Sequence, residues 1–175
     1  MRSEVRQWVT SIVQARQPKG PILEVGSLDI NGTLRDLFPQ EGYVGLDMRD
    51  GLGVDLVADI LARLQKKSDP LWGKFNTAVI FETLEHTTDP AEVLVRMWRA
   101  LRPGGLFIGS WCMAFPIHSC PGDYWRITPD GFRHVLEAAG FKDIEVVTEG
   151  GTLAFPVGVF ATAIKDGRVP GLVEI

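Results

Sequence analysis

Hydrophobic residues recur at helical spacing within the first 20 residues of the chain. The apolar side chains fall at positions i, i+3, i+4, i+7 and i+8, which is the pattern of a helix with one buried face. They are Val5, Trp8, Val9, Ile12 and Val13. Ser3 is placed to cap this helix, and Pro18, Gly20 and Pro21 are expected to end it.

Two later segments show the same helical periodicity. In "DPAEVLVRMWRALRPGG", Asp89 is placed as the cap and Pro90 takes the first helical position. In "TPDGFRHVLEAAGF", Thr128 is the cap and Gly140 is the stop. The inward stripes are Leu94, Met97, Trp98 and Leu101 in the first segment, and Phe132, Val135, Leu136 and Ala139 in the second.

Short apolar runs bounded by turn residues alternate with these segments and are typical of buried parallel strands. The runs are "ILEV" from Ile22, "YVGLD" from Tyr43, "VDLVAD" from Val54, "TAVIF" from Thr77 and "LFIGSW" from Leu106. Two further runs, "DIEVV" and "VGVFATAIK", follow the last helix and can pair antiparallel. The order predicts a Rossmann-like, doubly wound α/β fold with a mostly parallel sheet, helices on both faces and ligands at the carboxyl edge.

Each of the first three predicted strands has a carboxylate at or beside that edge. Glu24 lies in the first strand, Asp47 ends the second about twenty residues later, and Asp59 follows the third. Any one of them is as typical of a solvated cap or turn. Their repetition favours a nucleotide-type site, in which Gly26 lets the backbone turn and Asp47 accepts hydrogen bonds from a ribose diol.

The turn "GSLDING" discriminates between nucleotide-like ligands. It supplies Gly26 and Gly32 but lacks the middle glycines that let a backbone approach a pyrophosphate, and Leu28 and Asp29 obstruct or repel that group. Negative charge here suits a ligand that carries an ammonium and a sulfonium. S-adenosylmethionine fits that description.

Composition narrows the function classes further. The chain of 175 residues suits a single domain over 1–175, and a net charge of −4 argues against a nucleic-acid partner. We expect no membrane insertion and a cytoplasmic location, because the N-terminal segment is charged throughout and no run is long and apolar enough to span a bilayer. Cys112, His118 and Cys120 lack the close spacing of a zinc site, so no metal is predicted.

The chain resembles class I S-adenosylmethionine-dependent methyltransferases over nearly its whole length. The matching motifs are "EVGSLDING", "YVGLDMRDG", "VADI", "FETLEHTTDPAEVLVRMWRALRPGG" and "GFRHVLEAAGF". More narrowly, the chain looks like a group of small bacterial or phage methyltransferases. The resemblance implies a seven-stranded sheet with an antiparallel last strand, an N-terminal helix in 1–20, a cofactor-binding half in 21–111, and a substrate loop with C-terminal strands in 112–175.

The resemblance also implies a set of cofactor contacts. Gly26 and Ser27 would line the methionine part, with Glu24 reaching its amino group directly or through water. Asp47 would hold the ribose hydroxyls, and Gly32 would restore the close backbone approach that the missing glycine removes. The remaining implied contacts are Met48, Asp59 and Ile60 around adenine, and Phe81 and Glu82 at the amino acid or reacting end.

The segment "WCMAFPIHSCPGDYWRITP" is expected to form the substrate side. His118 is a candidate general base with Asp123 beside it, although an ordinary loop histidine fits the pattern equally well. Tyr124 and Trp125 suit stacking on a sugar or planar acceptor, and Arg126 suits a carboxylate or phosphate, or all three anchor a lid. The resemblance of this loop to those of glycan-linked methyltransferases favours a hydroxyl acceptor.

Three function hypotheses follow from these observations. The first is methyl transfer to a small-molecule or glycan acceptor at a hydroxyl oxygen. The second is a non-catalytic cofactor-binding or scaffold protein with the same fold, and the third is a nicotinamide-dependent oxidoreductase. The late run "FPVGVFATAI" fits a core strand, the edge of a homodimer, or both.

Overall fold

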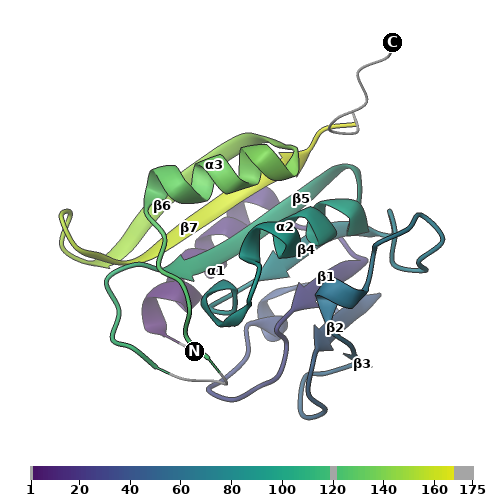
Figure 1. The fold of residues 1–175 in the computed structure, drawn as a ribbon, viewed down its shortest axis with the longest axis horizontal. Coiled ribbons are helices and arrows are strands. Elements are labelled where there is room, and N and C mark those ends of the chain that lie inside the picture. The colour runs from purple at the N-terminus through teal and green to yellow at the C-terminus, as the bar shows by residue number, and fades with distance from the viewer. Residues whose placement is uncertain (1, 119–121, 168–175) are drawn as a thin grey trace.

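The computed structural model describes residues 2–118 and 122–167, and its centre is one seven-stranded sheet (Figure 1). The strands are β1 (Ile22–Val25), β2 (Tyr43–Asp47), β3 (Leu56–Val57), β4 (Phe75–Ile80), β5 (Leu101–Cys112), β6 (Phe141–Gly151) and β7 (Pro156–Lys165). Their order is β3-β2-β1-β4-β5-β7-β6, and the first five run parallel. β7 is antiparallel to both β5 and β6, which confirms the predicted fold class.

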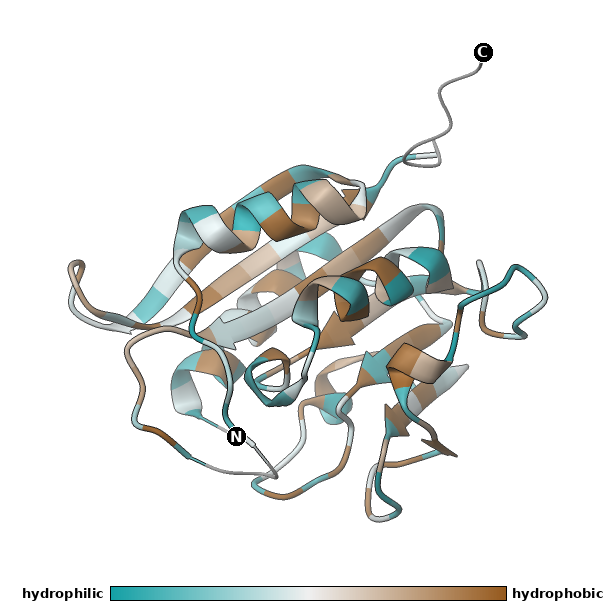
Figure 2. Ribbon diagram, in the orientation of Figure 1, coloured by the Kyte–Doolittle hydropathy of each residue, from teal (hydrophilic) through white to brown (hydrophobic). Residues whose placement is uncertain are grey.

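Helices cover both faces of this sheet. In Figure 1, α1 (Ser3–Arg16) lies behind the sheet, and α2 (Pro90–Ala100) and α3 (Pro129–Ala139) lie in front of it. Three short 3₁₀ helices follow strand ends: η1 (Arg35–Leu37), η2 (Ile60–Ala62) and η3 (Leu84–His86). Figure 2 shows hydrophobic residues along the central strands, while α2 and α3 carry both hydrophobic and hydrophilic residues, as amphipathic helices do.

The caps predicted for α2 and α3 are present, and the one predicted for α1 is not. The Asp89 side chain accepts from the Glu92 N–H at 3.0 Å, and Thr128 Oγ1 accepts from the Gly131 N–H at 3.1 Å. Ser3 is instead the first helical residue, and its hydroxyl donates to the Glu4 carboxylate at 3.1 Å. Because Ser3 already has helical backbone geometry, its side chain cannot reach forward as a cap does.

The segments that follow β1 and β2 depart most from a regular alternation of strands and helices. They form loops and η1 instead of full helices, and β3 is shorter than the predicted run from Val54 to Asp59. Leu34 and Phe38, from the first of these loops, are buried beside α1. They fill space that a helix would otherwise occupy, so this face of the sheet is closed by side chains from a loop.

The run "FPVGVFATAI" belongs to the core. β7 contains most of it and is paired on both sides, with β5 and with β6. From the α1 side, the Trp8 ring packs on the Phe160 ring with 4.9 Å between centroids. None of the helices in the described part of the chain combines the length and the hydropathy needed to span a bilayer.

Candidate active site

The turn after β1 is built on a glycine that no other residue can replace without strain. Gly26 has φ of +77°, and a Cβ atom at this position would overlap the Thr83 side chain. The N–H groups of Gly26 and Ser27 both donate to the Leu46 carbonyl, at 2.9 and 3.2 Å. The β1 turn is therefore packed tightly between the ends of β2 and β4.

The second half of this turn is held by its own polar groups. The Gly32 N–H donates to the Asp29 carboxylate at 2.7 Å, and Gly32 has φ of +98°. The Asp29 N–H donates to the Leu52 carbonyl at 2.9 Å, which ties the turn to the segment after β2. The turn is thus held both by the Asp29 side chain and by the segment after β2.

Asp47 ends β2 with its carboxylate at the same edge. One oxygen accepts from the Leu28 N–H at 3.3 Å and the other from the Arg49 N–H at 3.0 Å. A carboxylate oxygen has two lone pairs, so each oxygen can accept one more hydrogen bond. This geometry suits a pair of neighbouring hydroxyl groups, as in a ribose.

Glu24 lies below the turn in an almost closed environment. Its side chain points to the α1 face, is 6% exposed, and accepts from the Tyr43 hydroxyl at 2.9 Å. Burial raises the pKa of Glu24 to about 7, against the opposing effects of the Tyr43 hydrogen bond and the Arg35 charge. The Arg35 guanidinium lies 4.5 Å above the Tyr43 ring, which completes this group.

The residues expected around adenine lie in different environments. Met48 is 70% exposed beside Asp47, so its side chain is accessible to a ligand. Asp59 caps η2 by accepting from the Leu61 N–H at 2.8 Å, and it keeps one oxygen free of this bond. Ile60 is buried in the main hydrophobic core.

The end of β4 places Glu82 at the edge and Phe81 in the core. Phe81 is buried beside Phe38, whereas Glu82 has an unusual left-handed backbone with φ of +48°. The Glu82 carboxylate accepts from Arg2 Nε at 2.7 Å and from Ser110 Oγ at 2.9 Å. A non-glycine residue held in this conformation is found often at functional sites.

A cavity of about 640 Å³ lies in the loop between β5 and α3. Its walls come from two segments of that loop: Met113, Ala114, Phe115, Pro116 and Ile117 on one side, and Asp123, Tyr124, Trp125 and Arg126 on the other. Arg2 connects this loop to the strand edge, because its guanidinium lies 5.2 Å from the Phe115 ring centre while it binds Glu82. Tyr124, Trp125 and Arg126, which the sequence suggested as acceptor contacts, all line this cavity.

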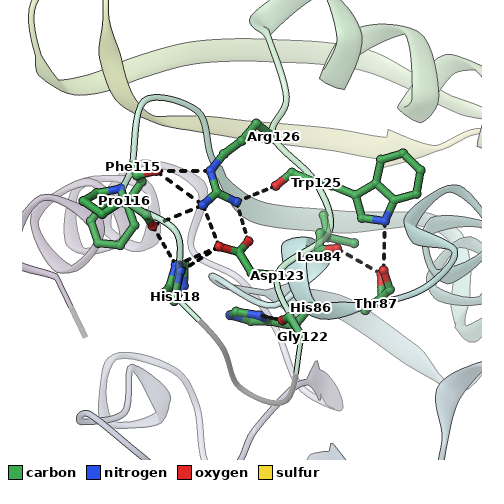
Figure 3. A network of polar contacts seen from close by, with 10 residues as sticks. All are labelled: Leu84, His86, Thr87, Phe115, Pro116, His118, Gly122, Asp123, Trp125 and Arg126. Carbon is green, nitrogen blue, oxygen red and sulfur yellow. Dashed lines mark hydrogen bonds and ion pairs between the residues drawn. The ribbon is translucent and has the colours of Figure 1, made fainter.

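Asp123 and Arg126 hold this loop together (Figure 3). The Asp123 carboxylate is almost fully buried and forms a two-pronged ion pair with the Arg126 guanidinium, which also donates to the Phe115 and Pro116 carbonyls. Asp123 accepts from the His118 N–H at 2.8 Å, and His118 Nδ1 lies 3.4 Å from the same carboxylate. The Arg126 and His118 hydrogen bonds hold the pKa of Asp123 well below its ordinary range.

The donors of Arg126 are largely engaged inside the loop. Its three nitrogens bind Asp123 and backbone carbonyls, so its geometry favours holding His118 and the cavity walls in place over binding a free anion. Trp125 ties the loop to the β4 side, because its Nε1–H donates to the Thr87 carbonyl at 3.0 Å. The Trp125 side chain is half-exposed.

The sequence pattern gives no signal for two groups in this site. Arg2 and Glu82 are 80 positions apart, and their ion pair depends on how α1 crosses the sheet. Tyr43 and Glu24 become neighbours through the register of β1 with β2, where Ile22 pairs with Tyr43 and Glu24 with Gly45. That register, once known, puts both side chains on one face because side chains alternate along strands.

Comparison with known proteins is consistent with this geometry. Residues 44–109 match a family model described as a methyltransferase domain. No curated protein sequence gives a significant match.

Solved structures share the fold over most of the chain. The 1,6-didemethyltoxoflavin-N1-methyltransferase of Burkholderia thailandensis, solved with 1,6-didemethyltoxoflavin and S-adenosylhomocysteine, has a TM-score of 0.69 at 15% identity and covers 92% of this chain and 78% of its own. The N-methyltransferase NodS of Bradyrhizobium japonicum WM9 was solved with S-adenosylhomocysteine. It has a TM-score of 0.67 at 16% identity, and the match covers 92% of this chain and 85% of NodS. The CurJ carbon methyltransferase has a TM-score of 0.67 at 16% identity, and the match covers 92% of this chain and 54% of the CurJ chain.

Proposed function

We propose that this chain is a class I S-adenosylmethionine-dependent methyltransferase and that it methylates a hydroxyl oxygen of a small-molecule acceptor bound beside His118. The observation that carries the choice of acceptor is the pairing of His118 with Asp123, a residue that lines the cavity. A hydroxyl must lose its proton when it is methylated, so a general base beside the acceptor favours a hydroxyl. The proteins compared above are named for nitrogen or carbon acceptors.

The residues at the strand edge fit the cofactor. Asp47 offers one free acceptor position on each oxygen for the ribose hydroxyls, and the left-handed backbone of Gly26 forms the turn beside it. Glu24 lies beneath the turn, where its ionised form would attract the ammonium of the methionine part. Gly32 and Ser27 complete the turn, and Met48 and Asp59 remain available to adenine. S-adenosylmethionine supplies a methyl group on a sulfonium, which an in-line nucleophile displaces.

Transfer then requires alignment, exclusion of water and a place for the proton. In His118, Nδ1 faces the Pro116 carbonyl at 3.1 Å and the Asp123 carboxylate, so Nδ1 carries the hydrogen and Nε2 carries the free lone pair. Nε2 is the atom that would accept the hydroxyl proton. Asp123 would stabilise the resulting imidazolium, and Arg126 would keep Asp123 in position.

The cavity walls favour a sugar-like acceptor. Tyr124 and Trp125 line the cavity and are 55% and 44% exposed, and aromatic rings of this kind suit stacking on a sugar ring. We therefore propose a sugar or a similar polyhydroxylated small molecule as the first acceptor class to screen.

Cofactor binding is tested by calorimetric titration of the full chain with S-adenosylhomocysteine, with NAD as the comparator ligand. We expect saturable binding of S-adenosylhomocysteine and an affinity about 10-fold lower in Asp47→Asn, because a charge-assisted bond to each hydroxyl is weakened. Asp50→Asn is the matched control: it removes the same charge from an exposed residue three positions away, and we expect no change.

Acceptor chemistry is tested separately in an assay that follows S-adenosylhomocysteine release with a panel of sugar, phenol and amine acceptors. Turnover with hydroxyl acceptors that falls about 100-fold in His118→Ala would support the proposed base. Turnover with amines alone would refute the hydroxyl proposal. Tight cofactor binding without turnover across the panel would favour the non-catalytic binding protein.

A further inference from the structure

Three potential metal-ligating side chains meet where the loop between β5 and α3, here called the acceptor loop, touches η3. Glu85 and His86 come from η3, and His118 comes from the loop. One ligand atom of each lies within 4.8 Å of the other two. Figure 3 shows the rings of His86 and His118 close together, and their centroids are 4.8 Å apart in an edge-to-face arrangement.

The Glu85 carboxylate is the first sign that this cluster has an unfilled role. Its side chain is completely buried, and neither oxygen accepts a hydrogen bond of normal geometry from the residues that the structure describes. The thiol of Cys112 lies nearby, but a thiol is a weak donor. A buried carboxylate without strong partners is costly, and such groups in proteins are usually paired or coordinate a metal.

The hydrogen bonds of the two histidines are the second sign. His86 Nδ1 contacts the Gly122 carbonyl, and His118 Nδ1 lies 3.1 Å from the Pro116 carbonyl. A carbonyl oxygen only accepts, so Nδ1 carries the hydrogen in both rings and Nε2 carries the lone pair. Metal-ligating histidines show this arrangement, in which the second ring nitrogen donates to a carbonyl or carboxylate and fixes the ring.

We propose that Glu85, His86 and His118 form a binding site for a divalent transition metal, with Zn²⁺ as the best match. Two imidazoles and one carboxylate are a ligand set that zinc uses, and a fourth position would stay open. Zinc–ligand bonds of about 2.0–2.1 Å place tetrahedral ligand atoms about 3.4 Å apart, so the three ligand atoms, now within 4.8 Å of one another, would have to move closer together to bind the ion. These residues differ from the Cys112, His118 and Cys120 set considered from the sequence, in which Cys120 lies outside the described residues.

The metal would join the acceptor loop to η3 and would occupy the lone pair of His118. A histidine bound to metal through Nε2 cannot accept a proton there. If the proposed function holds, zinc and the general base therefore compete for one atom, and zinc inhibits transfer to hydroxyl acceptors. Metal binding itself does not depend on the proposed function.

The test is calorimetric titration of the chelator-treated full chain with ZnCl₂ alone. We expect one equivalent to bind to the wild type, with an affinity at least about 10-fold lower in Glu85→Gln and in His118→Ala. Glu85→Gln replaces the buried carboxylate with an amide of the same size. The His118 side chain is partly exposed, so we expect its removal to leave the fold intact. His134→Ala is the matched control, since His134 is exposed on α3 and lies outside the cluster, and it should bind zinc as the wild type does.

Co²⁺ added in place of zinc reports the ligand set by its visible absorption, and thermal unfolding checks that each variant is folded. No zinc binding by the wild type, or an equal loss in His134→Ala, would overturn the proposal. So would loss of binding in Cys120→Ser with none in Glu85→Gln, because the ligands would then be thiols. None of these titrations contains S-adenosylhomocysteine. They therefore test zinc binding even if the protein proves not to transfer methyl groups.

Discussion

The strand edge and the acceptor loop are held in place by different kinds of bond. At the strand edge, Gly26 and Asp47 are positioned mainly by backbone hydrogen bonds and by the register of parallel strands. In the described parts of the loop between β5 and α3, residues 113–118 and 122–128, backbone hydrogen bonds from Met113, Ala114, Tyr124 and Ile127 anchor the loop. Most of its other contacts are made by side chains, with Asp123 and Arg126 at their centre.

This difference fits the roles proposed for the two regions. A backbone turn gives one fixed shape, which suits a single cofactor. A loop held by side-chain bonds can change its cavity by substitution without disturbing the sheet, which suits an acceptor that differs from one enzyme to the next. The comparison predicts that damage at the edge will affect the whole fold, whereas damage in the loop will stay local.

Gly26→Ala is expected to have the largest effect. The left-handed backbone costs about 1–2 kcal/mol for alanine, and overlap with the Thr83 side chain adds about 1–3 kcal/mol. We expect the free energy of unfolding to fall by about 4 kcal/mol, measured by urea denaturation. Calorimetry should show S-adenosylhomocysteine binding lost or weakened more than about 10-fold, because Thr83 and the turn must move apart.

Gly104→Ala is the matched control for this change. Gly104 has almost the same φ, +78°, but a Cβ there would meet no atom within 4 Å. It should lose only the backbone part, about 1–2 kcal/mol, and keep its affinity for S-adenosylhomocysteine. Equal losses in the two variants would mean that close packing at Gly26 contributes nothing.

The two regions also differ in how far the sequence alone could predict them. The caps at Asp89 and Thr128 were predictable because each bond spans three residues, and the edge carboxylates were predictable because parallel strands end together. The Glu24–Tyr43 bond depends on strand register, and the Arg2–Glu82 pair depends on the path of α1. Single-sequence patterns do not determine either quantity.

The loop shows the same limit more clearly. The residue types of the loop suggested a general base and acceptor contacts, but they did not indicate which hydrogen-bond partners each side chain would have. Arg126 was expected either to bind an anionic group of an acceptor or to anchor a lid, and its donors are engaged with Asp123 and nearby carbonyls. Glu85 gave no signal, because its burial follows from the loop packing over η3, and contacts between distant segments are not periodic.

Glu24→Gln is expected to change the pH dependence of stability. In the folded chain Glu24 keeps its proton up to a pKa of about 7, whereas the unfolded chain releases it near 4.5. Between these values the folded state binds more protons, so stability falls as pH rises through this window. The fall amounts to about 3 kcal/mol for this burial and is complete above about pH 7.

The variant should lack this part of the curve, since the glutamine amide keeps the Tyr43 hydrogen bond and does not ionise. Urea denaturation of both proteins at a series of pH values gives the difference directly. In the wild type, S-adenosylhomocysteine affinity should also rise with pH over the same range, because its ammonium attracts the ionised carboxylate. Parallel stability curves for the two proteins would show that Glu24 titrates normally.

Trp125→Phe is expected to have the smallest effect, and the comparison of the two regions depends on where that effect appears. It removes the 3.0 Å bond from the indole to the Thr87 carbonyl, worth about 1 kcal/mol. Hydrogen exchange should speed up in residues 113–128 alone, with global unfolding unchanged.

Trp98→Phe removes the same type of bond, 3.1 Å to the Gly140 carbonyl, between α2 and the end of α3. Because Trp98 lies in the main core, its loss should lower the global free energy of unfolding instead. If Trp125→Phe lowered global stability as much as Trp98→Phe, the loop would be part of the cooperative core, and its freedom to vary independently of the sheet would be refuted.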